Sequence, residues 1–146
     1  MANTSALDTL IDLAQRESDA CAKRLGAALK AVEEGEQKLT MLTGYRQDYA
    51  DKLDAAQVNG ITPFAYANFT AFVGKLDNAI NGQREVIKHA QFKADTERRA
   101  WQESERKRLS YRTLNERAAQ EALAIENKRD QKMMDDHAAR TVRNSR

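Results

Sequence analysis

The feature that most constrains this chain is a run of apolar residues spaced alternately four and three positions apart. It begins at Leu7, ends at Ala56, and is interrupted only at Ser18, Gly35 and Arg46. An apolar repeat held over seven heptads makes a supercoiled seam between helices, whereas an isolated surface helix shows only a drifting stripe. The first part of the chain is therefore expected to be one long helix that packs lengthwise against another.

A helix stop and a helix start follow one another just after this run. Gly60 can adopt the left-handed conformation that closes a helix. Thr62 can accept a hydrogen bond from the first free amides of the next helix, and Pro63 fits that helix's first turn. A second, less regular seam then runs from Tyr66 to Trp101 and beyond. So short a connection forces the two helices to be antiparallel.

The predicted fold is all-α, an antiparallel two-helix coiled-coil hairpin that forms a single domain over residues 1–146. Helix one is expected at about 5–57, the turn at about 58–62 and helix two at about 63–140. If the chain folds back at the turn, residues whose numbers add to about 121 face each other. Helix two then has no partner beyond about residue 116 and projects as the longer helix. We expect a monomer, or at most weak association.

Composition argues against catalysis. Charged residues make up 32% of the chain and aromatic residues 6%, which supplies a narrow seam but no concave pocket. His89 and His137 are far apart in the sequence, and neither is near Cys21. The sequence has no glycine-rich phosphate loop and no metal-ligand spacing. We therefore expect no enzyme activity, no catalytic residue, no metal site and no cofactor.

The sequence also indicates a cytoplasmic location. It has no run of about 20 apolar residues that could insert in a bilayer, and its first residues lack the pattern of a secretion signal. Cys21 is the only cysteine, so no disulfide can form within the chain, as suits a reducing compartment.

Charge is unevenly distributed. Residues 1–60 carry 7 Lys/Arg and 10 Asp/Glu, and residues 61–146 carry 17 and 12. The basic stretch comprises Arg98, Arg99, Arg106, Lys107, Arg108, Arg112 and Arg117. It is either a solvated face or a cationic helix that docks on an acidic protein or on nucleic acid. The alternative function is thus a nucleic-acid-binding or generic scaffolding coiled coil, although no uninterrupted basic arm precedes a zipper here.

Aromatic side chains near the turn suggest a second surface. Tyr45 and Phe72 fall outside the seam, so the packing of the hairpin does not bury them. The expected pairing gathers a patch across both helices, made of Leu42, Tyr45, Tyr49, Phe72, Leu76 and Ala79. Exposed aromatic side chains at helical spacing favour protein–protein contact. A third helix or a dimer partner that covers them is the alternative.

Several segments of the chain form a recognisable set: residues 6–14, Met41 and Leu42 with Tyr45 and Tyr49, Asn59 to Ile61 at the turn, Trp101, and residues 126–135. Together they resemble the FliJ family, stalk-like cytoplasmic components of the bacterial flagellar type III export apparatus. The resemblance covers essentially the whole chain and keeps register without evident gaps.

The resemblance implies a non-enzymatic stalk that links a hexameric flagellar export ATPase to a membrane export gate protein. Such a stalk promotes assembly of the ATPase ring and export of flagellar proteins, and so supports motility and chemotaxis. It also binds flagellar export chaperones. It lies peripherally at the cytoplasmic face of the inner membrane, without inserting directly into the membrane and without binding nucleic acid. The implied gate-binding residues are Leu42, Tyr45, Tyr49, Phe72, Leu76, Ala79 and Gln83. The residues expected to bind the ATPase ring are Leu13, Arg106, Lys107, Arg108, Arg112 and Arg117.

Overall fold

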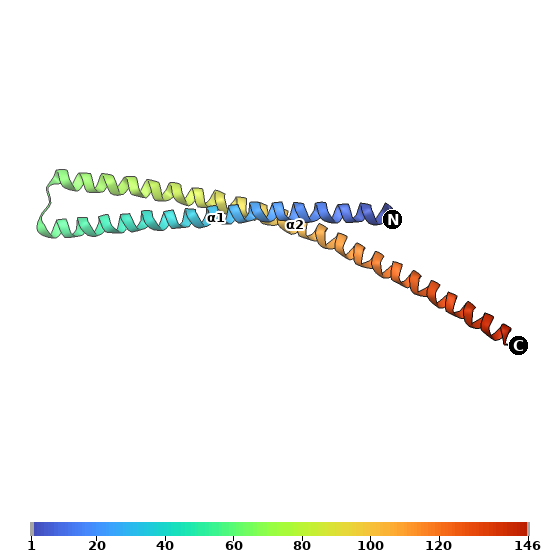
Figure 1. Cartoon of the computed structure of the whole chain (residues 1–146). Helices are drawn as coiled ribbons and strands as arrows, with labels where there is room; N and C mark the ends of the chain where they lie inside the picture. The colour runs from blue at the N-terminus through green and yellow to red at the C-terminus, as the bar shows by residue number, and fades with distance from the viewer. Residues whose placement is uncertain (1, 146) are drawn as a thin grey trace. The chain divides into compact units, whose positions relative to one another are not determined.

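Two long helices make up almost all of the protein. The structure is a computed structural model that describes residues 2–145. Helix α1 (Ala2–Asn59) is followed by the longer helix α2 (Pro63–Asn144), and no strand occurs among these residues (Figure 1). The predicted all-α fold with a longer second helix is confirmed. The chain forms two compact units: a turn unit, Asp19–Gln102, and an end unit, Met1–Ser18 with Glu103–Arg146.

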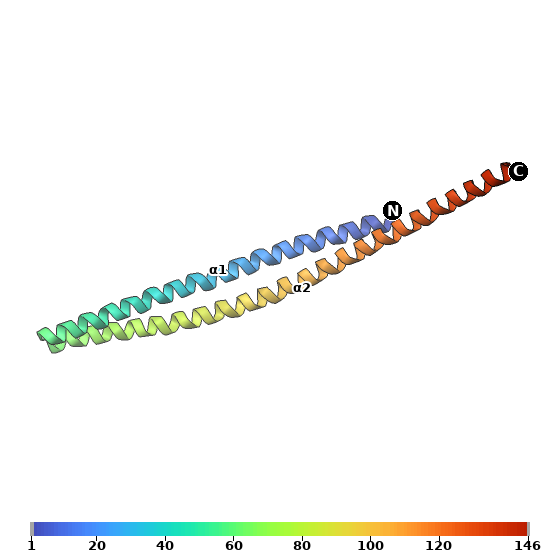
Figure 2. The ribbon, with the colours of Figure 1, turned by 90° about the horizontal axis from the view of Figure 1, so that it is seen from below.

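In the turn unit the two helices are antiparallel (Figures 1 and 2) and joined by three residues, drawn in green at the left of Figure 1. Gly60 has a φ of 90°, a conformation that other residues rarely adopt. The Ala65 N–H donates a hydrogen bond to Thr62 Oγ1 at 3.1 Å, which satisfies one of the free amides at the start of α2. The predicted stop at Gly60 and the predicted cap at Thr62 are both confirmed.

Burial follows the predicted seam. Every position of the first seam, from Leu7 to Ala56, is buried or half-buried, and almost all residues between them are exposed. The buried positions of α2 are Leu76, Ile80, Gln83, Ile87, Ala94 and Ser104. The predicted start of the second seam was wrong by one residue, because Tyr66 is 44% exposed and Ala65 is half-buried in its place. Near the turn the packing follows two successive four-residue steps, which a helix of 3.6 residues per turn accommodates.

The three interruptions of the first seam are places where polar groups bridge the helices. In the end unit the Ser18 hydroxyl donates a hydrogen bond to Glu105 Oε1. In the turn unit the Gln83 amide donates to the Gly35 carbonyl at 3.1 Å, and Arg46 forms an ion pair with Asp77. These pairs have residue numbers that add to about 121, as the fold-back geometry requires. A slip by one heptad would leave buried polar groups unpaired, so the bridges help to fix the register.

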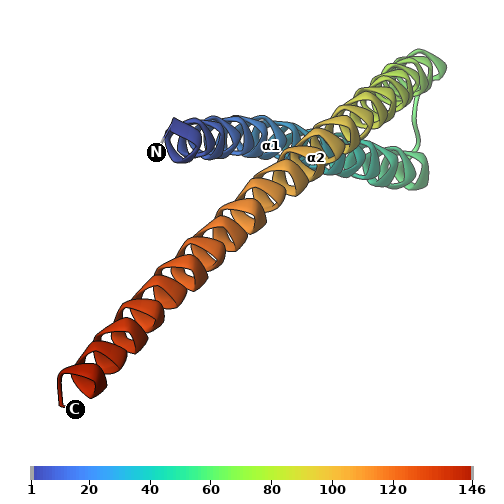
Figure 3. The same cartoon turned by 90° about the vertical axis from the view of Figure 1, so that its right-hand side faces the viewer.

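Among the described residues of the end unit, no α1 residue packs against the C-terminal part of α2. All side chains from Glu116 to Ser145 are exposed, and the end unit's own segment of α1 does not lie beside the red end of α2 (Figure 3). The expected loss of pairing beyond about residue 116 is confirmed. A helix that is polar on all sides contributes no core, so the packed region ends near Asn115.

Candidate interaction surfaces

An aromatic surface, defined here as Tyr45, Tyr49, Phe69 and Phe72, lies close to the turn in the turn unit. The Tyr49 ring stacks on Phe72 with centroids 4.2 Å apart and meets Phe69 edge-on at 6.0 Å. A shallow groove of about 360 Å³ runs between them, lined also by Ala65 and Asn68. The sequence placed Tyr49 opposite Phe72, and their contact confirms that placement. Phe69, which also lines this groove, was not singled out from the sequence.

The seven predicted gate-binding residues differ in what they offer a partner. Tyr45 is 52% exposed and Phe72 is 40% exposed, while Ala79 is exposed and Leu42 and Tyr49 are half-buried. Leu76 and Gln83 are each only 8% exposed. They occupy seam positions, and the Gln83 amide already donates a hydrogen bond to the Gly35 carbonyl. A partner that binds here would therefore contact mainly the other five residues.

A second surface lies in the end unit. Leu13 and Leu10 of α1 are 55% and 43% exposed. With Lys107 and Tyr111 of α2 they line a groove of about 380 Å³. The structure thus brings together Leu13 and Lys107, which the sequence analysis had named without a contact between them. Leu10 and Tyr111 were not named from the sequence as partner-binding residues. Leu10 precedes Leu13 by three residues and therefore lies on the same helix face.

Most cations of the basic stretch form ion pairs with carboxylates of the same helix. Arg98 pairs with Asp95 and Arg106 with Glu103, each at 3.3 Å. Two further pairs join Arg108 to Glu105 at 2.8 Å and Arg112 to Glu116 at 3.3 Å. Among residues 2–145, Lys107 and Arg117 form no ion pair. Of the predicted ring-binding cations, these two are therefore the ones without an ion pair in the described part of the chain, and Glu17 lines the same groove as Lys107.

Arg108 serves packing more than partner binding. Its guanidinium group donates two hydrogen bonds to Glu105, at 3.1 and 2.8 Å, and the Arg108 and Glu105 side chains are each 24% exposed. Glu105 also accepts a hydrogen bond from the Ser18 hydroxyl. Hydrogen bonds from Arg108 first and Ser18 second hold the pKa of Glu105 below its ordinary value. Arg117, by contrast, lies beside Leu109 and Leu114 at the rim of an open groove of about 480 Å³.

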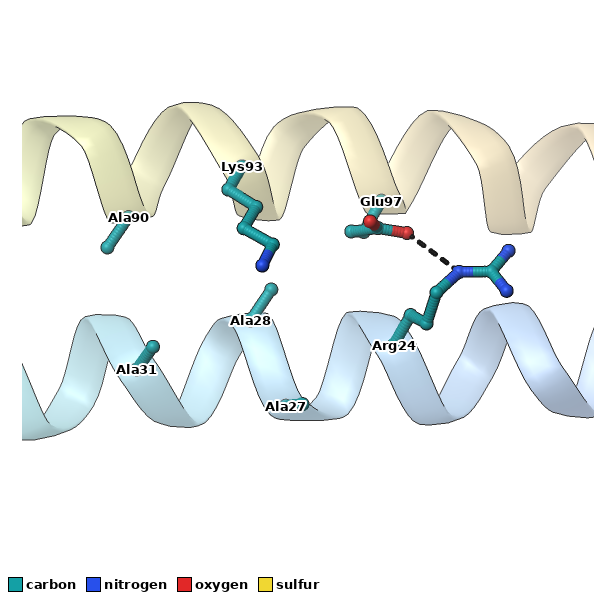
Figure 4. A pocket seen from close by; sticks show the side chains of 7 residues that line it. All are labelled: Arg24, Ala27, Ala28, Ala31, Ala90, Lys93 and Glu97. Atoms are coloured by element: carbon teal, nitrogen blue, oxygen red, sulfur yellow. Dashed lines mark hydrogen bonds and ion pairs between the residues drawn. The ribbon is translucent and has the colours of Figure 1, made fainter.

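An alanine-lined pocket of about 190 Å³ lies between the helices of the turn unit (Figure 4). Its walls are Ala27, Ala28, Ala31 and Ala90; Lys93 points into it, and the Arg24–Glu97 ion pair closes one end at 3.2 Å. No group of three potential metal ligands occurs within residues 2–145. In the same part of the chain, neither helix has a stretch long and apolar enough to span a membrane. The pocket is lined by alanine methyl groups, the Lys93 side chain and one ion pair.

Residues 3–146 match the family described as flagellar FliJ protein. The chain belongs to this family. It is 34% identical over 142 residues to the flagellar FliJ proteins of Salmonella typhi and of Escherichia coli strain K12, covering 97% of this chain and 97% of each of theirs. A solved structure from Chlamydia trachomatis, described as a YscO homolog, is 16% identical with a TM-score of 0.49, covering 94% of this chain and 90% of that one. As a FliJ-family member, the protein is a component of the flagellar export apparatus.

Proposed function

We propose that this protein is a non-catalytic stalk that joins a hexameric flagellar export ATPase to a membrane export gate protein. It works in the cytoplasm, at the inner face of the membrane. It promotes assembly of the ATPase ring and export of flagellar proteins, and it binds export chaperones. The observation that carries this proposal is the exposed aromatic surface of the turn unit.

The aromatic surface has the properties of a protein-binding site. Tyr45 and Phe72 leave large apolar areas in water, and the groove beside Phe72 can take a side chain from a partner. Stacking on Tyr49 holds Phe72 in one orientation before any partner arrives. Pre-organised aromatic side chains of this kind often supply most of the binding energy at protein interfaces. We assign this surface to the export gate.

The end unit supplies the proposed contact with the ATPase ring. The Leu10 and Leu13 groove combines exposed apolar area with the unpaired charge of Lys107. The exposed helix after Asn115 adds length without a second helix, so it can enter a ring too narrow for a helical pair. We assign ring binding to this unit, with Lys107 and Arg117 as the cations that steer association.

Nucleic-acid binding is the weaker alternative. Affinity for a phosphate backbone depends on the number of cations that can neutralise it. Arg98, Arg106, Arg108 and Arg112 already have carboxylate partners, which lowers the positive potential of this face. A gel-shift assay with duplex DNA at low salt separates the two functions, because a stalk stimulates the ATPase and does not retard DNA.

Co-purification with the cytoplasmic part of the export gate tests the proposal. Tyr45→Ala should weaken gate binding by about 1–2 kcal/mol, since an exposed tyrosine anchor is lost. Its melting temperature should change little, because Tyr45 is 52% exposed. Phe72→Ala should weaken gate binding and also cost about 1 kcal/mol of stability through the lost stack on Tyr49.

Phe92→Ala is the matched control, because Phe92 lies in the same unit, is 73% exposed and is outside the aromatic surface. It should leave gate binding unchanged. Equal gate binding by the wild type, Tyr45→Ala and Phe72→Ala would show that the gate binds elsewhere and would overturn the assignment.

A further inference from the structure

The turn lies in an uncharged region that extends beyond the proposed gate contact, which accounts only for Phe69, Phe72 and the residues beside them. Residues 55–74 contain no Asp, Glu, Lys or Arg, although 32% of the chain is charged. No other uncharged stretch in the sequence is longer than seven residues. Three of the four phenylalanines fall within it. So long an interruption of an otherwise regular charge pattern indicates surroundings in which charge is costly.

The most exposed apolar side chains of the turn unit lie at the two helix ends that flank the turn. Val58, near the end of α1, is 86% exposed, and Phe64, at the start of α2, is 77% exposed. Ile61 lies between them and is half-buried. We call Val58, Ile61, Pro63 and Phe64 the tip. None of these four residues belongs to the aromatic surface.

Charge is absent from every side of the tip. The uncharged region includes the last five residues of α1 and the first twelve of α2. A helix completes a turn in 3.6 residues, so both stretches cover all helix faces. A protein partner seated on one face would leave the opposite face free to carry charge. Surroundings that enclose the whole end of the hairpin would not.

We propose that the tip inserts into the boundary between headgroups and acyl chains of a phospholipid bilayer. The charged residue nearest to the turn is Asp54, five residues before the end of α1. That separation is roughly 8 Å along the helix, and interfacial segments bury about 5–10 Å of their structure in a bilayer. Gln57, Asn59 and Thr62 are polar but uncharged, and they can hydrogen-bond to headgroups and water at that depth.

The charges that border the region determine the lipid preference. Asp51, Lys52, Asp54 and Lys75 carry no net charge together. Binding therefore depends on apolar insertion, without attraction to anionic lipid, and should be insensitive to salt. This inference deepens the proposed location at the membrane face and rests on it, since a bilayer must be within reach. It departs from the expectation of no direct membrane insertion, because that expectation concerned spanning helices and did not consider the uncharged tip.

The test places a fluorescent reporter at the tip of the full-length protein. In a Trp101→Phe background, which removes the only tryptophan, Phe64→Trp is mixed with phosphatidylcholine/phosphatidylglycerol vesicles with and without brominated acyl chains. The tip tryptophan should shift to the blue and be quenched by the brominated lipid. Phe92→Trp in the same background is the control, because Phe92 is 73% exposed but outside the uncharged region. It should show neither effect.

Vesicle flotation supplies the second measurement. Val58→Ser with Phe64→Ser should lower vesicle partitioning at least about tenfold, as expected when two buried apolar side chains are lost. Phe92→Ser should not lower it, and 0.5 M salt should leave wild-type binding unchanged. Circular dichroism checks that each variant remains helical. Absence of the blue shift, equal quenching of both reporters, or binding abolished by salt would overturn the proposal.

Co-purification of the tip variant with the export gate distinguishes a failure of this inference from a failure of the proposed function. Because the tip lies outside the aromatic surface, Val58→Ser with Phe64→Ser should retain gate binding while losing vesicles. Loss of gate binding by this variant, without any lipid signal in the wild type, would assign the tip to a protein and overturn the lipid contact. Loss of gate binding only in Tyr45→Ala bears on the proposed function alone.

Discussion

At Gly35 the absence of a side chain sets how closely α1 and α2 approach. A Cβ atom built there would lie 3.1 Å from Ile87 Cγ1 and 3.5 Å from Gln83 Nε2. The Gly35 backbone carbonyl accepts a hydrogen bond from the Gln83 side-chain amide, so the close approach of the helices and this hydrogen bond depend on each other. A larger residue would push Ile87 away and stretch this polar bridge.

Two glycine substitutions separate helix propensity from close packing. At Gly26 a Cβ meets nothing within 4 Å, so Gly26→Ala should raise the free energy of unfolding by about 0.5–1 kcal/mol through helix propensity alone. Gly35→Ala has the same propensity gain but crowds Ile87, and its net stabilisation should be smaller than that of Gly26→Ala or negative. Urea unfolding of both variants measures the difference. Equal stabilisation by the two substitutions would mean that Ile87 can move away from a Cβ at residue 35 without loss of stability.

Glu105 makes the stability of the end unit depend on pH. Hydrogen bonds from Arg108 and Ser18 favour its charged form and lower its pKa in the folded state. Its contribution to stability is therefore fully present above the ordinary glutamate pKa of about 4.3 and is lost as the pH falls through the lower folded value. We expect Glu105→Gln to reduce the change in the free energy of unfolding with pH in this acidic range. Glu103→Gln is the control, because Glu103 is paired only at the surface and should leave the acid profile unchanged.

At the scale of the elements, the turn depends on two local signals that act from opposite sides. Gly60 ends α1 through its positive φ, and Thr62 begins α2 through its side-chain oxygen. Neither signal needs a contact with the rest of the protein. Local capping of this kind places a turn reliably even where the helices on both sides are exposed.

Thr62→Ala should lower the free energy of unfolding by about 1 kcal/mol, because the Ala65 N–H loses its side-chain acceptor. Thr70→Ala is a suitable comparison, since the Thr70 hydroxyl donates only to carbonyls of the preceding turn of its own helix. That substitution should be neutral or slightly stabilising. Thermal melts followed by circular dichroism compare the two, and a Thr62 variant as stable as the Thr70 variant would argue against the cap.

At the scale of the whole molecule, the two units should be separable in function. Among the described residues, ending the chain after residue 115 removes only exposed side chains, Glu116 to Ser145, so the melting temperature should change little. Stimulation of the export ATPase should be lost, because the exposed helix is the part that we assign to the ring. Gate binding should be retained, since the aromatic surface lies wholly in the turn unit.

Lys107→Glu in the full-length chain refines the same experiment. It should weaken ring association more than Arg108→Gln does, because Lys107 has no carboxylate partner among the described residues whereas Arg108 is held by Glu105. The Lys107 effect should diminish at high salt. Full ATPase stimulation by the truncated chain would show that the exposed helix does not contact the ring.

The sequence by itself determined the helices, the turn, the seam and the pairing of Tyr49 with Phe72. These depend on periodicity and capping, which are local properties, and one short turn then fixes which residues face each other. Only the tertiary structure decided which side chains remain available to a partner. Tyr45 and Phe72 keep about half and two fifths of their surface exposed, and most of the basic stretch is paired with acids. Exposure and ion pairing depend on side-chain conformation and on the neighbouring helix, which the spacing of residues along one chain does not specify.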